Sequence, residues 1–148
     1  KMLGKGSWGE VFLARTCDSS PLDNNEDHPH LPSNQKYAMK IMRRSALKKH
    51  RVGRFGNGLS LLDKEIAVMK KMNHPNCVKL HQVIDDSSKD ECFLVMDYVP
   101  GGCLMPEVGQ DQHWKMRIDY IYVCMREVVC GLEYMHRNNI VHGDIKVG

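Results

Sequence analysis

The sequence predicts an α+β fold, with a β-sheet in the N-terminal part of the chain and helices after it. Two observations carry this prediction. Residues typical of strands flank a glycine-rich stretch near the N-terminus and recur at 36–42 and 93–99. Apolar residues recur at spacings of three and four over 59–72 and 117–138, which is the pattern of amphipathic helices. With 148 residues, the chain is long enough to bury a core.

The composition argues against several classes of function. The formal net charge of +3, from 21 basic and 18 acidic side chains, is too small to indicate binding to nucleic acid or to a membrane surface. No apolar run approaches the roughly 20 residues that span a bilayer. The six cysteines contain no C-x-x-C pair, so neither a zinc site nor a disulfide framework is expected. We therefore expect an intracellular protein with reduced thiols, located in the cytoplasm, with the nucleus as the alternative.

The glycine-rich stretch reads Leu3-Gly4-Lys5-Gly6-Ser7-Trp8-Gly9-Glu10-Val11. Glycines at this spacing let backbone N–H groups approach a ligand that side chains would block, and an anion such as a phosphate is the typical partner. Glycine triplets also occur in ordinary hairpin turns, so the pattern alone leaves both interpretations open. Residues 10–15 after the triplet are typical of a strand, whereas a dinucleotide-binding turn leads into a helix. We therefore predict that the triplet joins two strands.

The segment 16–35 is polar and contains almost no apolar residues, which predicts a long solvated loop. His28 and His30 lie in this loop. They lack a third ligand, so a metal site there is a weak alternative to simple exposure.

A buried lysine and a helical glutamate are predicted to pair. By strand alternation Lys40 shares a face with Ala38 and Met42, and an ammonium group on an inward face needs a partner. Glu65 falls on the apolar stripe of the helix 59–72, where an unpaired carboxylate would be costly. We predict that Glu65 pairs with Lys40. The alternative is a glutamate that reaches solvent from the edge of the stripe.

These features together resemble the N-terminal lobe of a eukaryotic protein kinase. The resemblance rests on Gly4-x-Gly6-x-x-Gly9-x-Val11, Tyr37-Ala38-Met39-Lys40, the helical Glu65, His74-Pro75-Asn76, and Phe93-Leu-Val-Met-Asp-Tyr-Val99 before Pro100-Gly101-Gly102. It implies a five-stranded antiparallel sheet with one helix over residues 1–99, including the hinge. Residues 100–148 would form the start of the helical lobe, with two helices and a catalytic loop.

The resemblance implies that ATP binds under the glycine-rich stretch. Met96 would be the gatekeeper residue beside the adenine, and the backbones of Asp97 and Val99 would form hydrogen bonds with it. Leu3, Val11 and Ala38 would form the apolar roof. The full set assigned to ATP is Leu3, Gly4, Lys5, Gly6, Ser7, Trp8, Gly9, Val11, Ala38, Lys40, Glu65, Met96, Asp97 and Val99.

The segment Ile140-Val-His-Gly-Asp-Ile-Lys146 resembles the kinase catalytic loop. The resemblance makes Asp144 the carboxylate that orients the substrate hydroxyl and accepts its proton, and Lys146 the group that steadies the transferred phosphoryl. A lysine two residues after that aspartate is typical of the serine/threonine class. Gly143 stands where most kinases carry an arginine that contacts the activation-loop phosphate, so less dependence on that phosphate is implied.

The family uses magnesium with ATP, but the sequence stops at Val147-Gly148 before the family's metal-binding asparagine and Asp-Phe-Gly motif. Losing one charge-stabilising group typically costs about a hundredfold or more in rate, so this chain alone is expected to be essentially inactive. The alternatives are a pseudokinase, which binds a nucleotide or a partner, and a non-functional truncation. Part of the apolar stripe on the helix 117–138 is expected to lack partners and to favour aggregation, namely Ile118, Ile121, Met125 and Val128.

The basic segment 43–58, together with the run 64–76 and Val83-Ile-Asp-Asp86, resembles the calcium/calmodulin-dependent protein kinase kinases. That family implies a protein substrate that is itself a kinase of the AMP-activated type. Calmodulin is an implied partner, although no calmodulin-binding segment occurs in the sequence. The basic segment could dock the substrate kinase through Arg51 and Arg54, or it could be an ordinary solvated loop.

Overall fold

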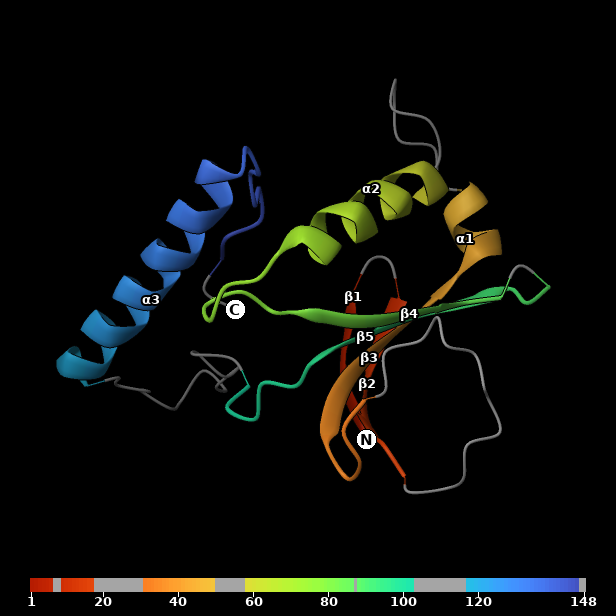
Figure 1. The fold of residues 1–148 in the computed structure, drawn as a ribbon, viewed down its shortest axis with the longest axis horizontal. Coiled ribbons are helices and arrows are strands. Elements are labelled where there is room, and N and C mark those ends of the chain that lie inside the picture. The colour runs from red at the N-terminus through yellow and green to blue at the C-terminus, as the bar shows by residue number, and fades with distance from the viewer. Residues whose placement is uncertain (7–8, 18–30, 50–57, 87, 103–116, 147–148) are drawn as a thin grey trace, which may run out of the picture. The chain divides into compact units, whose positions relative to one another are not determined.

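The computed structural model describes residues 1–6, 9–17, 31–49, 58–86, 88–102 and 117–146 (Figure 1). Residues 18–30 of the predicted loop 16–35, including His28 and His30, therefore lie outside the described residues. The chain forms two compact units. The first comprises Lys1–Met72 and Lys79–Tyr98, and the second comprises Asn73–Val78 and Val99–Gly148. The predicted domain division after residue 99 stays a prediction.

The first unit contains a five-stranded sheet in the order β1-β2-β3-β5-β4. Every neighbouring pair is antiparallel. This arrangement confirms the predicted fold class and the predicted five-stranded sheet (Figure 1). The strands are β1 (Met2–Gly6), β2 (Gly9–Arg15), β3 (Lys36–Arg43), β4 (Leu80–Asp85) and β5 (Glu91–Asp97).

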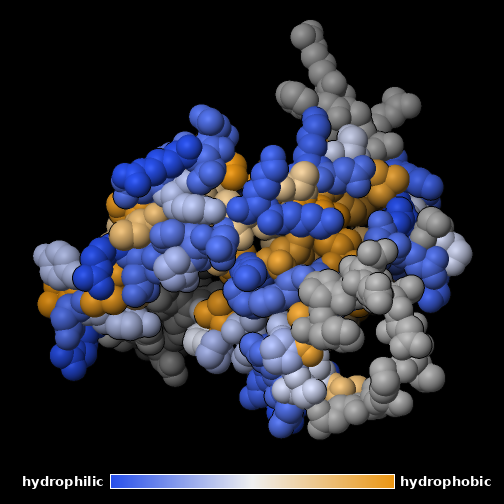
Figure 2. All heavy atoms as spheres, in the orientation of Figure 1, coloured by the Kyte–Doolittle hydropathy of each residue, from blue (hydrophilic) through white to orange (hydrophobic). Residues whose placement is uncertain are grey.

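The helix α2 (Gly58–Lys71) begins and ends within one residue of the predicted helix 59–72. Leu62 on α2 is buried in one apolar cluster with residues of β3, β4 and β5, and Ile66 and Met69 pack against that cluster. Each large apolar side chain buried in this way stabilises the fold by about 1.5–3 kcal/mol. Figure 2 shows hydrophobic residues where α2 meets the sheet. The buried members are Met42, Leu47, Leu62, Leu80, Cys92 and Leu94.

The helix α1 (Arg44–Lys49) was not predicted, because the basic composition of 43–58 indicated a connecting segment. Leu47, which is 3% exposed, anchors α1 in the core, while Lys48 and Lys49 stay exposed. A six-residue segment with one core residue shows no periodicity, so its helical state was not visible in the sequence. Arg51 and Arg54 lie outside the described residues.

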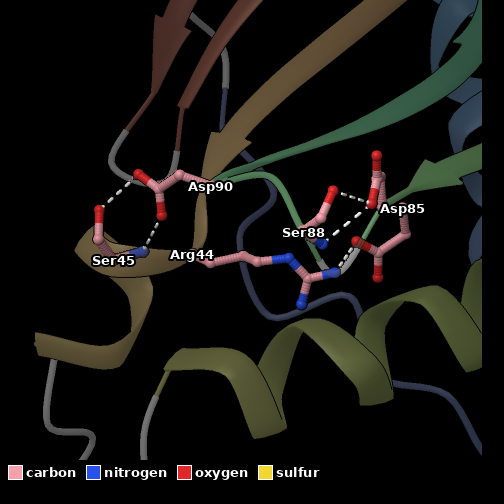
Figure 3. A network of polar contacts seen from close by, with 6 residues as sticks. Arg44, Ser45, Asp85, Ser88 and Asp90 are labelled. Carbon is pink, nitrogen blue, oxygen red and sulfur yellow. Dashed lines mark hydrogen bonds and ion pairs between the residues drawn. The ribbon is translucent and has the colours of Figure 1, made fainter.

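A polar network ties α1 to the turn between β4 and β5 (Figure 3). The carboxylate of Asp90 accepts hydrogen bonds from the backbone N–H and the hydroxyl of Ser45, at 2.7 and 2.6 Å. The guanidinium of Arg44 forms an ion pair with Asp85. Asp90 thus satisfies N–H and O–H groups at the start of α1 that would otherwise depend on water.

The second unit contains α3 (Ile118–Arg137), within one residue of the predicted helix 117–138. The loop 73–78 packs against α3. The hydroxyl of Tyr134 accepts a hydrogen bond from the N–H of Asn73 at 3.0 Å, and the ring of His74 stacks on Tyr134. A Cβ on Gly131 would lie 2.9 Å from the carbonyl oxygen of Asn76, so α3 and the loop 73–78 approach each other closely at this glycine.

The first half of α3 exposes apolar side chains. Ile118 is 66% exposed and Met125 is 57% exposed, and Figure 2 shows several hydrophobic residues at the surface of α3. The prediction that part of this stripe lacks packing partners is confirmed within the described residues. None of the helices described here has the length and apolar character needed to cross a membrane.

Candidate active site

The glycine-rich stretch joins β1 and β2, as predicted. Gly4 lies opposite Val11 and Gly6 lies opposite Gly9 in this antiparallel pair. Gly4 and Gly6 therefore belong to β1, and Gly9 begins β2. Ser7 and Trp8 lie outside the described residues.

The three glycines differ in what surrounds them. Gly9 has a φ of +152°, and a Cβ there would lie 2.2 Å from the carbonyl oxygen of Ile41, so the fold itself requires glycine at this position. Among the residues that the structure describes, a Cβ on Gly4 would meet nothing within 4 Å, and one on Gly6 would lie 4.0 Å from the carbonyl oxygen of Gly9. As far as the described part of the chain shows, the space beside Gly4 and Gly6 is open, which suits the close approach of a phosphate to the backbone.

One face of the sheet gathers the side chains assigned to the nucleotide. Val11 lies opposite Lys40, and Ala38 lies opposite Met96, so strand alternation places all four on the same face. Leu3 falls at an irregularity in the pairing of β1 with β2. These positions are consistent with the predicted roof and gatekeeper, whose roles stay predictions.

The opposite face of the sheet has a hollow of about 500 Å³. Phe12 and Ile41 contribute to its apolar lining, and the ion pair between Lys5 and Glu10 lies at its rim. Phe12 and Ile41 point away from the Lys40 face. Lys5, Gly6 and Gly9 also line this hollow, so it shares the glycine-rich stretch with the candidate nucleotide site while lying on the other face of the sheet.

Lys40 and Glu65 form the predicted ion pair. The Nζ of Lys40 lies 3.4 Å from the Oε1 of Glu65. The side chain of Lys40 is 20% exposed and that of Glu65 is 48% exposed, so the carboxylate is paired but not buried. Glu65 reaches solvent from the edge of the stripe and pairs with Lys40 at the same time. Pairs this exposed stabilise folding by only about 0–1 kcal/mol.

The hinge segment begins at Asp97, the last residue of β5. Its backbone N–H donates a hydrogen bond to the carbonyl oxygen of Lys79 at 3.0 Å, so the carbonyl is the backbone group of Asp97 that a ligand could use. Val99 belongs to the second unit and is 58% exposed. Sequence reasoning missed His81, whose ring contacts the Asp97 carboxylate at 2.6 Å.

The predicted catalytic loop lies in the second unit. The Nζ of Lys146 lies 3.3 Å from the Oδ2 of Asp144, and both side chains are largely exposed. The backbone N–H of Asp144 donates to the Nδ1 of His142 at 3.3 Å. Gly143 has a φ of +72°, a conformation that favours glycine over the arginine of most kinases. The structure thus brings the two predicted catalytic groups together in one exposed loop.

Within the part of the chain that the structure describes, no group of three or more His, Cys, Asp and Glu side chains could hold a metal ion. Magnesium is expected from the family alone. Asp144 carries an exposed carboxylate, which is the type of oxygen ligand that magnesium prefers.

The sequence pattern of the protein kinase domain matches residues 1–148, the whole chain. The chain belongs to the protein kinase family. A probable serine/threonine-protein kinase of Dictyostelium discoideum is 38% identical over 150 residues, covering 99% of this chain and 18% of that protein. The serine/threonine-protein kinase GRIK1 of Arabidopsis thaliana is 33% identical over 146 residues, covering 99% of this chain and 33% of that protein.

A calcium/calmodulin-dependent protein kinase kinase of Caenorhabditis elegans is 32% identical over 160 residues, covering 97% of this chain and 26% of that protein. This kinase chain therefore spans a third or less of the length of these three relatives. The names of the first two relatives support the serine/threonine class, in agreement with the lysine that follows Asp144 by two residues.

Proposed function

We propose that this kinase domain takes part in transferring the γ-phosphoryl group of ATP to a serine or threonine hydroxyl of a protein. The ion pair between Lys40 and Glu65 is the observation that carries the proposal. Strand alternation and helical periodicity bring these two groups together, and the pair adds little to stability. A lysine that is 20% exposed and fixed by a carboxylate is suited to hold the phosphates of ATP.

The residues of this chain have distinct roles in the proposed reaction. Gly4 and Gly6 let backbone N–H groups approach the phosphates, because no atom of the described neighbouring residues lies within 4 Å of where a Cβ would stand, apart from the Gly9 carbonyl oxygen at that limit. Asp144 orients the hydroxyl of the substrate and accepts its proton, and Lys146 stabilises the charge on the transferred phosphoryl. When bound, magnesium supplies further neutralisation of phosphate charge.

The experiment compares two lysines of β3 in the full-length protein. Lys40→Met removes the paired ammonium, and Lys36→Met removes an exposed lysine from the start of the same strand. We expect Lys40→Met to lower kcat/KM for ATP by at least about a hundredfold, and Lys36→Met to stay within about twofold of the wild type. Transfer of labelled phosphate from ATP to a protein substrate is the measurement. A wild-type protein that binds ATP without transferring phosphate would contradict the proposal and indicate a nucleotide-binding module.

We further propose that the protein substrate is another kinase, which this protein activates. The similarity to a calcium/calmodulin-dependent protein kinase kinase supports this proposal, as does the basic segment that includes the exposed Lys48 and Lys49. A basic segment attracts an acidic surface on a folded substrate more than it attracts a short peptide. Control by calmodulin stays a prediction that rests on the same similarity.

The test separates docking from chemistry. Replacing Arg51 and Arg54 with alanine should weaken phosphorylation of a substrate kinase while a short peptide is phosphorylated as before. Replacing Lys64 and Lys70, which are exposed on α2, with alanine is the matched control, because it removes the same amount of positive charge. Equal losses on the kinase and on the peptide would contradict docking by the basic segment.

A further inference from the structure

His81 lies at an irregularity in the pairing between β4 and β5. Leu80 pairs with Met96 and Gln82 pairs with Val95, so two steps along β4 correspond to one step along β5. His81 is therefore the extra residue of a β-bulge. Bulges change the direction of a side chain and are frequent next to functional sites.

The bulge is accompanied by a short contact between His81 and Asp97. The Nε2 of His81 lies 2.6 Å from the Oδ1 of Asp97, and the His81 side chain is only 21% exposed. The ring of Tyr37 contacts the imidazole edge to face, with the centroids 5.2 Å apart. Tyr37 is 2% exposed and lies opposite Asp97 in the β3–β5 pairing. The imidazole is thus held by a buried ring and by a carboxylate at the end of β5.

Asp97 makes two further hydrogen bonds to the segment that leads into β4. Its Oδ2 accepts from the backbone N–H of Lys79 at 2.9 Å, and its own N–H donates to the Lys79 carbonyl at 3.0 Å. Partial burial raises the pKa of the Asp97 carboxyl, but the hydrogen bonds from His81 and from the Lys79 N–H outweigh burial, so the pKa is lowered overall. Asp97 is therefore a carboxylate at neutral pH, with both oxygens engaged.

We propose that His81 is a positioning residue for the adenine of ATP, because it fixes Asp97 at the point where β5 leads into the hinge. The inference rests on the proposed function, in which the backbone of Asp97 contacts adenine. Its physical basis is the set of three hydrogen bonds that hold Asp97 to residues 79–81. Loss of the imidazole leaves the Oδ1 of Asp97 to water and loosens the end of β5, whereas Lys40 and the glycine-rich strands are unchanged.

The test uses the full-length protein with three histidine variants. His81→Leu removes the hydrogen bond, His81→Gln keeps an N–H donor of similar reach, and His136→Leu removes an exposed histidine of α3 as the matched control. We expect His81→Leu to raise the KM for ATP roughly fivefold to tenfold with kcat within about twofold. His81→Gln should restore most of the affinity, and His136→Leu should match the wild type. If His81→Leu does not fold, Asp97→Asn weakens the same contact and should raise the KM in the same way.

A binding assay with inorganic tripolyphosphate, which lacks adenine, separates the two parts of the nucleotide. His81→Leu should bind tripolyphosphate as tightly as the wild type while its affinity for ATP falls. An unchanged KM for ATP in folded His81→Leu, or an equal loss of tripolyphosphate binding, would overturn the inference and leave the proposed function intact. A wild type that neither binds nor uses ATP would overturn the proposed function, and the inference with it.

Discussion

Lys40 and Glu65 lie 25 residues apart in the sequence, yet the Nζ of Lys40 lies 3.4 Å from the Oε1 of Glu65. The pair joins β3 to α2 at a position where the glutamate is half exposed. A contact of this kind adds little to stability, so we expect its main effect to be on the direction of the lysine.

Glu65→Gln should therefore lower activity more than stability. The amide keeps the shape of the side chain but removes the charge that orients Lys40, and we expect kcat/KM for ATP to fall roughly tenfold to a hundredfold. Initial rates and thermal melts of the full-length protein are the measurements. Glu133→Gln is the control, because Glu133 pairs with Arg137 on the surface of α3 at 2.6 Å. A large fall in melting temperature for Glu65→Gln would show that the pair is structural.

Gly9→Ala should lower stability, whereas Gly4→Ala should affect ATP binding and leave stability unchanged. Alanine at position 9 would be strained at a φ of +152° and would meet the Ile41 carbonyl, so we expect a destabilisation of at least about 2 kcal/mol. Alanine at position 4 has free space, so the variant should melt like the wild type while the KM for ATP rises. Denaturant titration and steady-state kinetics separate the two effects. Equal stability of both variants would contradict the different surroundings of these glycines.

The contrast between Lys40 and His81 shows which parts of the site could be predicted. Alternation along a strand and periodicity along a helix each specify a face, so the pairing of Lys40 with Glu65 followed from local patterns. The direction of His81 depends on how β4 pairs with β5, and a bulge leaves no mark in the sequence. The helix α1 was missed for a related reason, since its support includes Asp90, which is 45 residues from Ser45. Local patterns predicted the long helices and the strands with strong alternation, whereas the helix α1 and the direction of His81 depend on contacts between distant segments.

Tyr134→Phe should destabilise the second unit. The hydroxyl of Tyr134 accepts a hydrogen bond from the N–H of Asn73, and its loss should cost about 1 kcal/mol, or more if the N–H finds no water. Tyr122→Phe is the matched control, because Tyr122 lies on the same helix and is 71% exposed. Hydrogen exchange at the Asn73 amide gives a local readout beside the denaturation curve. Identical exchange in Tyr134→Phe and in the wild type would show that the contact does not protect this amide.

Asp97 should make stability depend on pH in the acid range. Its carboxyl has a pKa below the ordinary value of 3.8, so the folded state favours the ionised form. The resulting stabilisation is fully present above the ordinary pKa and is lost as the pH falls through the lowered pKa of the folded state. Urea midpoints from pH 7 to pH 2 should show Asp97→Asn less stable at neutral pH, with the difference vanishing at the acid end. Asp119→Asn, at an exposed position of α3, is the control. A difference in urea midpoint between Asp97→Asn and the wild type that stays constant from pH 7 to pH 2 would contradict the link between the Asp97 pKa and stability.

The chain of 148 residues expressed alone should aggregate through α3. Apolar side chains along the first half of this helix stay exposed, including Ile118 at 66% and Met125 at 57%, and a contiguous apolar surface of this kind favours association. Replacing both residues with glutamate should raise the fraction of monomer in size-exclusion chromatography. Arg126→Glu also makes α3 more negative but removes no apolar side chain, so it should leave aggregation nearly unchanged if apolar contact is the cause. A wild-type chain that stays monomeric and melts in one sharp transition would show that the exposed stripe does not drive association.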